Sequence, residues 1–155
     1  MATLEVGTKV PDFSLPATDG ATFTLKGAAG KALVIYFYPK DMTSGCTRES
    51  QDFRDLHAAF RKAGVHIVGI SRDSLASHEK FKSKEQLPFA LLSDAHERVC
   101  KLFDVIREKS LYGRKYLGID RSTFLIDKRG VLRQEWRKVK VPGHAEEVLE
   151  AARAL

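Results

Sequence analysis

The sequence predicts an α/β fold in which helices flank a mixed central sheet, and three observations lead to this prediction. The runs 32–38 and 65–70 are almost entirely apolar, which is typical of strands buried on both faces of a sheet. The segment 46–63 between them has apolar residues at helical spacing, so 32–70 is typical of a βαβ unit with parallel strands. Further on, the turn 127–130 joins two strand-like runs and predicts an antiparallel hairpin that completes the sheet.

The length and composition indicate one domain that spans residues 1–155. The chain is long enough to bury a core, and its 43% hydrophobic and 30% charged residues are ordinary for a soluble protein. No apolar stretch is long enough to span a bilayer, and the N-terminus lacks the basic and apolar regions of a signal peptide. We therefore expect a cytoplasmic protein that makes no membrane contact.

The N-terminal part predicts short strands before the central sheet. Residues 13–15 and 22–25 alternate in the manner of strands, and Asp19-Gly20 between them is a hairpin turn signal. Residues 27–30, with a glycine at each end, form a flexible approach to the first long strand. This part should therefore be a preamble of short strands joined by a hairpin turn.

The first long helix is predicted over 46–63. It carries Phe53, Leu56 and Phe60 on one face, with charged residues elsewhere, and Gly64 supplies its end. The strand at 65–70 follows directly. The helix should therefore pack its apolar face on the sheet.

Two shorter helices and a strand follow. Asp73 or Ser74 can cap a helix over 75–84, and Pro88 prevents its extension. Residues 89–92 form a short strand. Ser93 or Asp94 then begins a short helix, whose apolar residues are Val99, Leu102 and Phe103.

The last third of the chain begins with its least regular segment, 107–120. Strands are predicted at 123–126 and 131–139, on either side of the turn already described. Pro142 and Gly143 lead into a final helix that ends near residue 155. The sum of these elements is a mixed sheet, parallel in its first part and closed by a hairpin, with helices on both faces.

The formal charge of +6 would suit an acidic partner. The densest basic stretch is Arg107 to Lys115, where Tyr112 interrupts the charges, and such a mixture can bind nucleic acid. The charges are dispersed, however, and match no binding motif. We therefore interpret the stretch as a solvated loop and expect no nucleic-acid partner.

The two cysteines, Cys46 and Cys100, do not form a disulfide framework. In a reducing compartment, two cysteines in such a chain are more often catalytic, redox-active or simply buried. Neither lies at zinc-ligand spacing from another cysteine or a histidine. We expect neither a metal nor a cofactor.

Cys46 comes at the point where a strand has ended and a helix begins, in Thr43-Ser44-Gly45-Cys46. The first amides of a helix have no internal partners, and the macrodipole favours negative charge there. A thiol at this end is shifted toward thiolate, which is the reactive form. A reactive cysteine at the first helix of such a mixed sheet is typical of a thioredoxin-like architecture, although the Cys-x-x-Cys of a thioredoxin is absent.

The segment 38–49 resembles the active-site segment of peroxiredoxins, with Pro39, Thr43 and Cys46 at the spacing Pro-x-x-x-Thr-x-x-Cys. The closest resemblance is to the bacterioferritin comigratory protein, or peroxiredoxin Q, branch. Residues 92–94 and 121–127 also resemble that branch. The likeness extends from about residue 7 to the C-terminus.

The resemblance implies a thioredoxin fold and the reduction of hydrogen peroxide or organic hydroperoxides by an external thiol. It also implies roles for six residues, with Cys46 as nucleophile, Thr43 and Arg121 as its polar partners, and Pro39, Gly45 and Glu49 around the substrate pocket. The chemistry agrees, because donors placed in line with the breaking O–O bond lower the barrier. Arg121 remains charged at working pH, and the Thr43 hydroxyl can donate from the same loop.

Three departures from the branch bear on the cycle and on local packing. Gln51 stands where many members carry a resolving cysteine, five residues after the first. Ser44 replaces a usual proline, and Asp104 stands where a glycine is common.

We expect a one-cysteine cycle resolved by thioredoxin, glutaredoxin or glutathione; the alternative is a Cys46–Cys100 disulfide. The protein should be a monomer or weak dimer.

The residues themselves leave other interpretations open. Thr43 could be only a helix cap, and Glu49 could serve only the helix dipole. The fold would also suit a general disulfide reductase or isomerase, although that activity needs a second nearby thiol. A non-enzymatic binding protein is a third class. None of the five scattered histidines stands out as a base: His57, His66, His78, His96 and His144.

Overall fold

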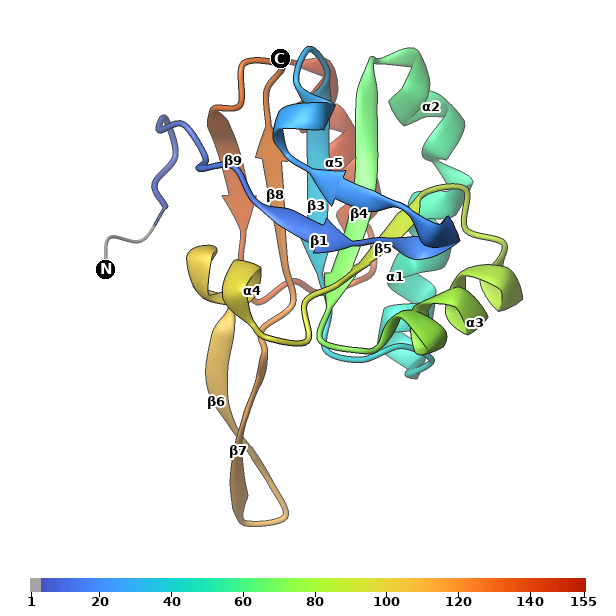
Figure 1. Ribbon diagram of the computed structural model, residues 1–155, viewed down its shortest axis with the longest axis vertical. Coiled ribbons are helices and arrows are strands. Elements are labelled where there is room, and N and C mark those ends of the chain that lie inside the picture. The colour runs from blue at the N-terminus through green and yellow to red at the C-terminus, as the bar shows by residue number, and fades with distance from the viewer. Residues whose placement is uncertain (1–3) are drawn as a thin grey trace.

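The structure is a computed structural model that describes residues 4–155. The expected lack of a signal peptide concerns in part residues 1–3, which lie outside the described residues. Its centre is a five-stranded sheet in the order β5-β4-β3-β8-β9 (Figure 1). The first three strands run parallel, and β8 and β9 are antiparallel, which confirms the predicted mixed sheet. The strands are β3 (Ala32–Phe37), β4 (Val65–Ser71), β5 (Ala90–Ser93), β8 (Ser122–Ile126) and β9 (Leu132–Trp136).

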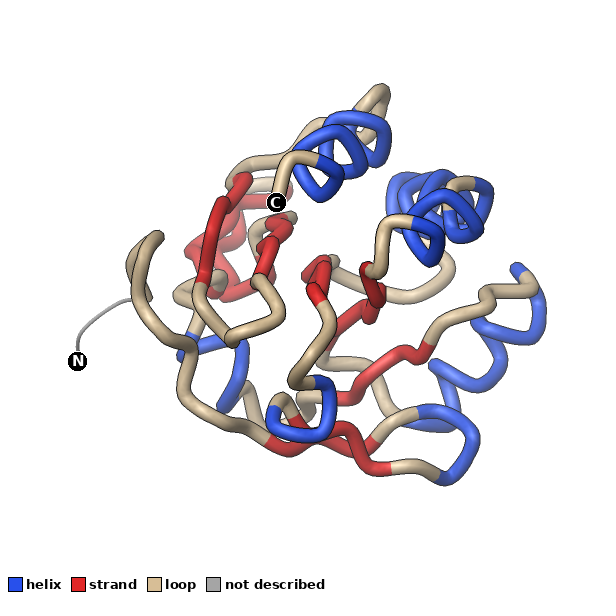
Figure 2. The backbone as a smooth tube through the Cα atoms, turned by 90° about the horizontal axis from the view of Figure 1, so that it is seen from above, coloured by secondary structure: helices blue, strands red, loops and turns tan. Residues whose placement is uncertain are grey.

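The two faces of the sheet are covered differently, as Figure 2 shows from above. Four helices cover one face: α1 (Ser44–Asp55), α2 (His57–Lys62), α3 (Leu75–Glu85) and α5 (His144–Arg153). The other face carries the hairpin of β1 (Ser14–Pro16) and β2 (Thr22–Thr24), with η1 (Thr18–Gly20), η2 (Lys26–Ala28) and α4 (Arg98–Leu102). Within residues 4–155, no helix is both long and apolar enough to cross a membrane.

Strand β3 separates two hydrophobic cores because successive side chains of a strand point to opposite faces. Leu33, Ile35 and Phe37 belong to the core beneath β1 and α4, which also contains Cys100. Val34 and Tyr36, together with Tyr38 just after the strand, belong to the core beneath the four helices, which contains Cys46. The prediction of a strand buried on both faces is confirmed, and the two cysteines lie on opposite sides of the sheet.

The predicted helix 46–63 is wrong in its bounds, because the structure has two helices there. The first begins at Ser44, so Cys46 lies in its first turn. The chain leaves helical geometry at Leu56 (φ −99°, ψ 3°), and α2 follows. Gly64 ends the second helix in the left-handed conformation (φ 77°), as predicted.

Helix α3 begins as predicted, with Ser74 as its cap accepting a hydrogen bond from the Ser77 amide. The start predicted for the next helix, Ser93 or Asp94, is wrong. Helix α4 begins only at Arg98, after Glu97 in a left-handed conformation (φ 61°). The Asp94 carboxylate instead accepts a hydrogen bond from the Cys100 amide at 2.7 Å.

The segment 107–120, predicted to be irregular, is a β-hairpin of β6 (Ile106–Leu111) and β7 (Arg114–Ile119). It projects from the body of the molecule (Figure 1). Tyr112 and Gly113 form its turn with positive φ angles of 51° and 77°, which a tight hairpin requires. Because both faces of the hairpin are largely exposed, its residues lack the alternation that predicts strands. The basic stretch predicted to be a loop therefore forms strands.

Candidate active site

The candidate site lies where β3 ends and β8 begins. These strands are antiparallel neighbours, with Phe37 paired to Ser122. The loop after β3 leads to Cys46 in the first turn of α1, and Arg121 immediately precedes β8. The register thus brings together two residues far apart in the sequence. The Arg121 Nη2 group donates a hydrogen bond to the Cys46 sulfur at 3.3 Å.

Glu49 holds the other side of the guanidinium. It lies three residues after Cys46 in α1, is only 1% exposed, and accepts from Arg121 Nη1 at 2.6 Å. Burial raises the pKa of Glu49 to about 7, although the adjacent Arg121 charge opposes that shift. Burial alone would lower the pKa of Arg121. The neighbouring Glu49 and Cys46 raise it by more, so the guanidinium remains a cation. Glu49 therefore fixes a charged donor against the sulfur.

Gly45 makes room for this arrangement. A Cβ atom on Gly45 would lie 3.2 Å from Nη2 of Arg121, closer than ordinary van der Waals contact. The absence of a side chain lets the guanidinium lie directly over the first turn of the helix. Ser44, which replaces the branch's usual proline, lies one residue earlier and is exposed.

Thr43 and Pro39 lie in the loop 38–43 that leads into α1. Thr43 occupies the N-cap position but makes no capping bond with its side chain. Its hydroxyl donates to the Lys40 carbonyl at 2.9 Å, and among residues 4–155 no hydrogen bond joins it to Cys46. Pro39 is half-buried in the same loop. Thr43 thus lies three residues before Cys46, and its hydroxyl bonds within the loop.

Cys100 lies apart from the other candidate residues. It is fully buried in α4, in the core on the opposite face of the sheet from Cys46, and both thiols are free. Burial raises the pKa of Cys100, and the neighbouring Asp94 carboxylate raises it further. The thiol is therefore held in its unreactive, protonated form.

Gln51, at the position of the branch's common resolving cysteine, ties α1 to α3. Its amide donates to the Glu85 carboxylate at 2.8 Å. No thiol is available at this position to meet Cys46.

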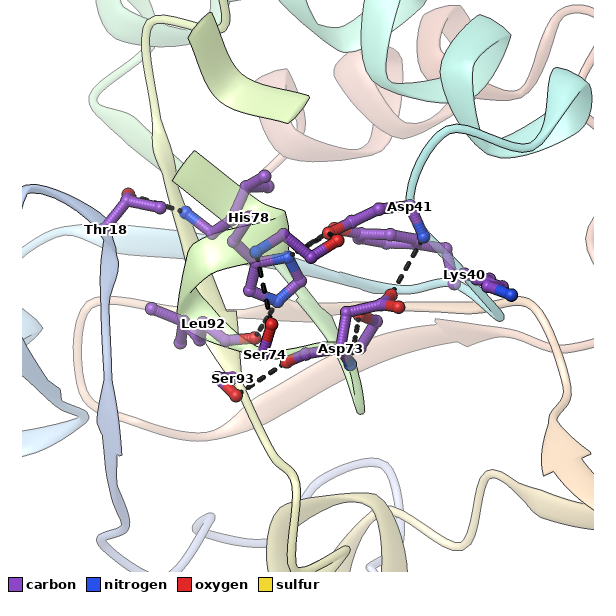
Figure 3. A network of polar contacts seen from close by, with 12 residues as sticks. Thr18, Lys40, Asp41, Asp73, Ser74, His78, Leu92 and Ser93 are labelled. Atoms are coloured by element: carbon purple, nitrogen blue, oxygen red, sulfur yellow. Dashed lines mark hydrogen bonds and ion pairs between the residues drawn. The ribbon is translucent and has the colours of Figure 1, made fainter. Parts of the chain in front are cut away.

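Sequence reasoning missed a buried polar cluster beside the loop, centred on Asp41 and His78 (Figure 3). His78, on α3, is fully buried and lies 2.7 Å from the Asp41 carboxylate through Nδ1. A lone histidine on a helix gives no sequence signal of such a partner. Only the place of Asp41 within the segment 38–49 could have drawn attention to it.

The fold and the cysteine–arginine contact are typical of one class of protein, the thiol-dependent peroxidases with a thioredoxin-like sheet. The model of the AhpC/TSA family matches residues 6–135. The chain therefore belongs to the AhpC/TSA family.

The relatives narrow this class to one branch. Peroxiredoxin Bcp of Bacillus subtilis is 51% identical over 148 residues, which cover 96% of this chain and 94% of the relative. A structure of Xanthomonas campestris peroxiredoxin Q is 51% identical with a TM-score of 0.90, covering 99% of this chain and 97% of that one. A structure of the bacterioferritin comigratory protein of the same organism is 50% identical with a TM-score of 0.90, covering 99% and 98%. The chain is thus a thiol-dependent peroxidase of the Bcp and peroxiredoxin Q branch.

Proposed function

We propose that the protein reduces hydrogen peroxide and organic hydroperoxides through the thiolate of Cys46. The contact between Arg121 Nη2 and the Cys46 sulfur carries this proposal, because it places a cation where a thiolate must be stabilised. The Xanthomonas campestris protein is described by its alkyl peroxide reduction activity, which supports organic hydroperoxides as one substrate class.

In the first half-reaction, the thiolate attacks one oxygen of the peroxide in line with the O–O bond. The S–O bond forms as the O–O bond breaks, and the electron pair of that bond leaves with the second oxygen. A proton from the solvent converts this oxygen to water or an alcohol. The sulfur, oxidised by two electrons, becomes a sulfenic acid. Negative charge moves from sulfur to oxygen, so a preorganised donor along that line lowers the barrier.

The remaining candidate residues would shape the pocket around this step. Arg121 would hold the peroxide as well as the thiolate, and Glu49 keeps the guanidinium in place. Gly45 leaves space for that guanidinium. Thr43 and Pro39 would line the mouth of the pocket. The Thr43 hydroxyl already donates to the Lys40 carbonyl, so its oxygen is free to accept a hydrogen bond from the peroxide.

The second half of the cycle uses an external thiol. That thiol attacks the sulfenic acid, water leaves, and a mixed disulfide forms, which a further thiol reduces to restore Cys46. Thioredoxin, glutaredoxin and glutathione are the candidate reductants, all of which belong to a reducing cytoplasm. We propose that one domain, residues 1–155, carries the whole reaction as a monomer or weak dimer.

The position of Cys100 supports this one-cysteine cycle over a Cys46–Cys100 disulfide. The two sulfurs belong to cores on opposite faces of the sheet. A disulfide requires Cα atoms within about 7 Å, so bridging would demand that α1 or α4 leave its place on the sheet. The alternative cycle therefore needs a large rearrangement that an external thiol avoids.

Peroxide turnover by two matched serine variants tests the proposal. Cys46→Ser should abolish turnover and keep the fold, since a hydroxyl is far less ionised and less nucleophilic than a thiol. Cys100→Ser should keep nearly full turnover with a suitable reductant. Substantial turnover in Cys46→Ser would contradict the proposal.

A further inference from the structure

A buried polar cluster joins the loop 38–43 to α3, outside the contact between Cys46 and Arg121. At its centre, the Asp41 carboxylate accepts hydrogen bonds from the Tyr38 hydroxyl at 2.6 Å and the Ser77 hydroxyl at 2.8 Å. The His78 Nδ1 atom lies 2.7 Å from the same carboxylate (Figure 3). The side chains of Asp41 and His78 are almost wholly removed from solvent.

The contacts of His78 determine how many protons this pair holds. The Nε2 atom lies 2.9 Å from the Leu92 carbonyl, which can only accept, so Nε2 carries a hydrogen. A neutral imidazole has one N–H, so Nδ1 would then present a lone pair to the carboxylate. A separation of 2.7 Å between two acceptors is repulsive. One further proton must therefore lie between Nδ1 and the Asp41 oxygen.

The surrounding groups favour placing that proton on His78. Asp41 already accepts two hydroxyl hydrogen bonds, as an ionised carboxylate does. Burial raises the pKa of Tyr38 well above its ordinary value, so its hydroxyl remains a donor. A second acid, Asp73, accepts from the Asp41 amide at 2.8 Å and from the Ser71 hydroxyl at 2.6 Å. In Figure 3, the Lys40 side chain points away from the cluster.

The cluster fastens the loop 38–43 to two neighbouring parts of the fold. The loop is anchored to the β4–α3 turn through the Asp41 amide, and to α3 through the Asp41 carboxylate. Next to it, exposed Met42 has a positive φ of 65°, which costs energy for a residue with a side chain. Such a conformation persists only where its surroundings impose it, and the Asp41 contacts are adjacent.

We propose that Asp41 and His78 are a positioning pair for the peroxidase reaction. Their shared proton holds the loop 38–43 against α3, and so holds Pro39 and Thr43 at the mouth of the peroxide pocket. Neither residue touches the reacting sulfur, and both act through the loop. This inference rests on the proposed function, in which that loop lines the pocket.

Two substitutions of His78 separate positioning from simple structural support. In His78→Asn, the amide nitrogen can take the place of Nδ1 and donate to Asp41. In His78→Gln, the amide can reach the Leu92 carbonyl but leaves Asp41 without its donor. The measured quantity is the rate constant for Cys46 oxidation by hydrogen peroxide in stopped-flow mixing. His78→Gln should react on the order of 10- to 100-fold more slowly, whereas His78→Asn should stay near the wild-type rate.

Phe60→Leu provides a control for lost stability, since Phe60 is a fully buried residue of α2 and outside the site. It should lower the melting temperature and leave the oxidation rate unchanged. If both His78 variants slowed in proportion to their loss of stability, the pair would be merely structural and the proposal overturned. A wild-type rate in His78→Gln would also overturn it.

Proton NMR supplies a readout that does not depend on turnover. The wild type should show a far-downfield, exchange-protected imidazole N–H from Nδ1, and His78→Gln should lack it. Absence of this signal from the wild type would overturn the shared proton.

Should His78→Gln fail to fold, Asp41→Asn and Asp41→Ala make the same comparison. Asparagine can donate to a neutral His78 and should keep the rate, whereas alanine should lose it. Turnover in Cys46→Ser would refute the proposed function, whereas a normal rate in His78→Gln beside an inactive Cys46→Ser would refute only the positioning pair.

Discussion

The guanidinium of Arg121 lies so close to Gly45 that any side chain at residue 45 would crowd it. The Cβ of an alanine there would lie 3.2 Å from Nη2, the atom that donates to the Cys46 sulfur. The absence of a side chain at residue 45 thus lets Arg121, the residue before β8, approach the first turn of α1 closely. The contact between sulfur and cation depends on this fit.

Gly45→Ala should therefore slow the reaction of Cys46 with peroxide. The methyl group would push Nη2 from the sulfur by a few tenths of an ångström, and we expect a loss on the order of tenfold in the oxidation rate constant. Ser44→Ala, in the same turn but exposed, is the matched control and should react normally. Equal rates in Gly45→Ala and the wild type would show that the close approach has no catalytic value.

Arg121→Ala should leave the thiol present but sluggish. Loss of one charged, preorganised donor typically costs on the order of 100-fold or more in rate. The donor lost is the Nη2 group that contacts the Cys46 sulfur. Stopped-flow oxidation by hydrogen peroxide measures the rate constant. If Arg121→Ala matched the wild-type rate constant, Arg121 would be removed from the site.

The buried Glu49 side chain should contribute to the free energy of unfolding by an amount that decreases as the pH rises. Burial raises its pKa from 4.5 to about 7, so between these values the folded protein keeps a proton that the unfolded chain has released. The stabilisation is complete below the unfolded pKa and is lost as the pH rises through the folded one. Glu49→Gln removes this component. The free energy of unfolding of the wild type minus that of Glu49→Gln should therefore decrease between about pH 4.5 and about pH 7.5 in urea titrations.

A second buried group, His144, changes stability with pH in the opposite direction. Its contribution cancels when the two proteins are compared. Burial lowers the pKa of His144 from 6.5 to about 4, so its contribution to stability is lost as the pH falls through that range. Both proteins contain His144, and the difference between them isolates Glu49. A difference in unfolding free energy that stays constant over this pH range would argue against a buried proton on Glu49.

The parts of the fold that the sequence predicted well are those with a buried apolar pattern. Strand β3 has side chains in both cores, and its continuous apolar run follows from this burial on both faces. The β6–β7 hairpin was missed because few of its side chains are buried, and its turn uses Tyr112 in a left-handed conformation. The break at Leu56 was missed because its side chain still packs on the same core as its neighbours.

The candidate site was predicted where its residues are neighbours in the chain and missed where they meet only through packing. Cys46 and its neighbours form one continuous segment, so the sequence could single them out together. Arg121 lies far along the chain, and only the family resemblance connected it to the cysteine. The pair of Asp41 and His78 was not found, because their contact arises from how α3 packs beside the loop. No spacing within the sequence records that packing.

The intact mass of the oxidised protein tests the central claim most directly, namely that Cys46 alone takes up the oxidising equivalent. The wild type is treated with one equivalent of hydrogen peroxide and analysed without reductant, with a sulfenic-acid trap in a parallel sample. We expect a gain of one oxygen, located on the peptide that contains Cys46, and the same gain in Cys100→Ser. A loss of two hydrogens in the wild type, absent from Cys100→Ser, would contradict the claim and make Cys100 the resolving residue.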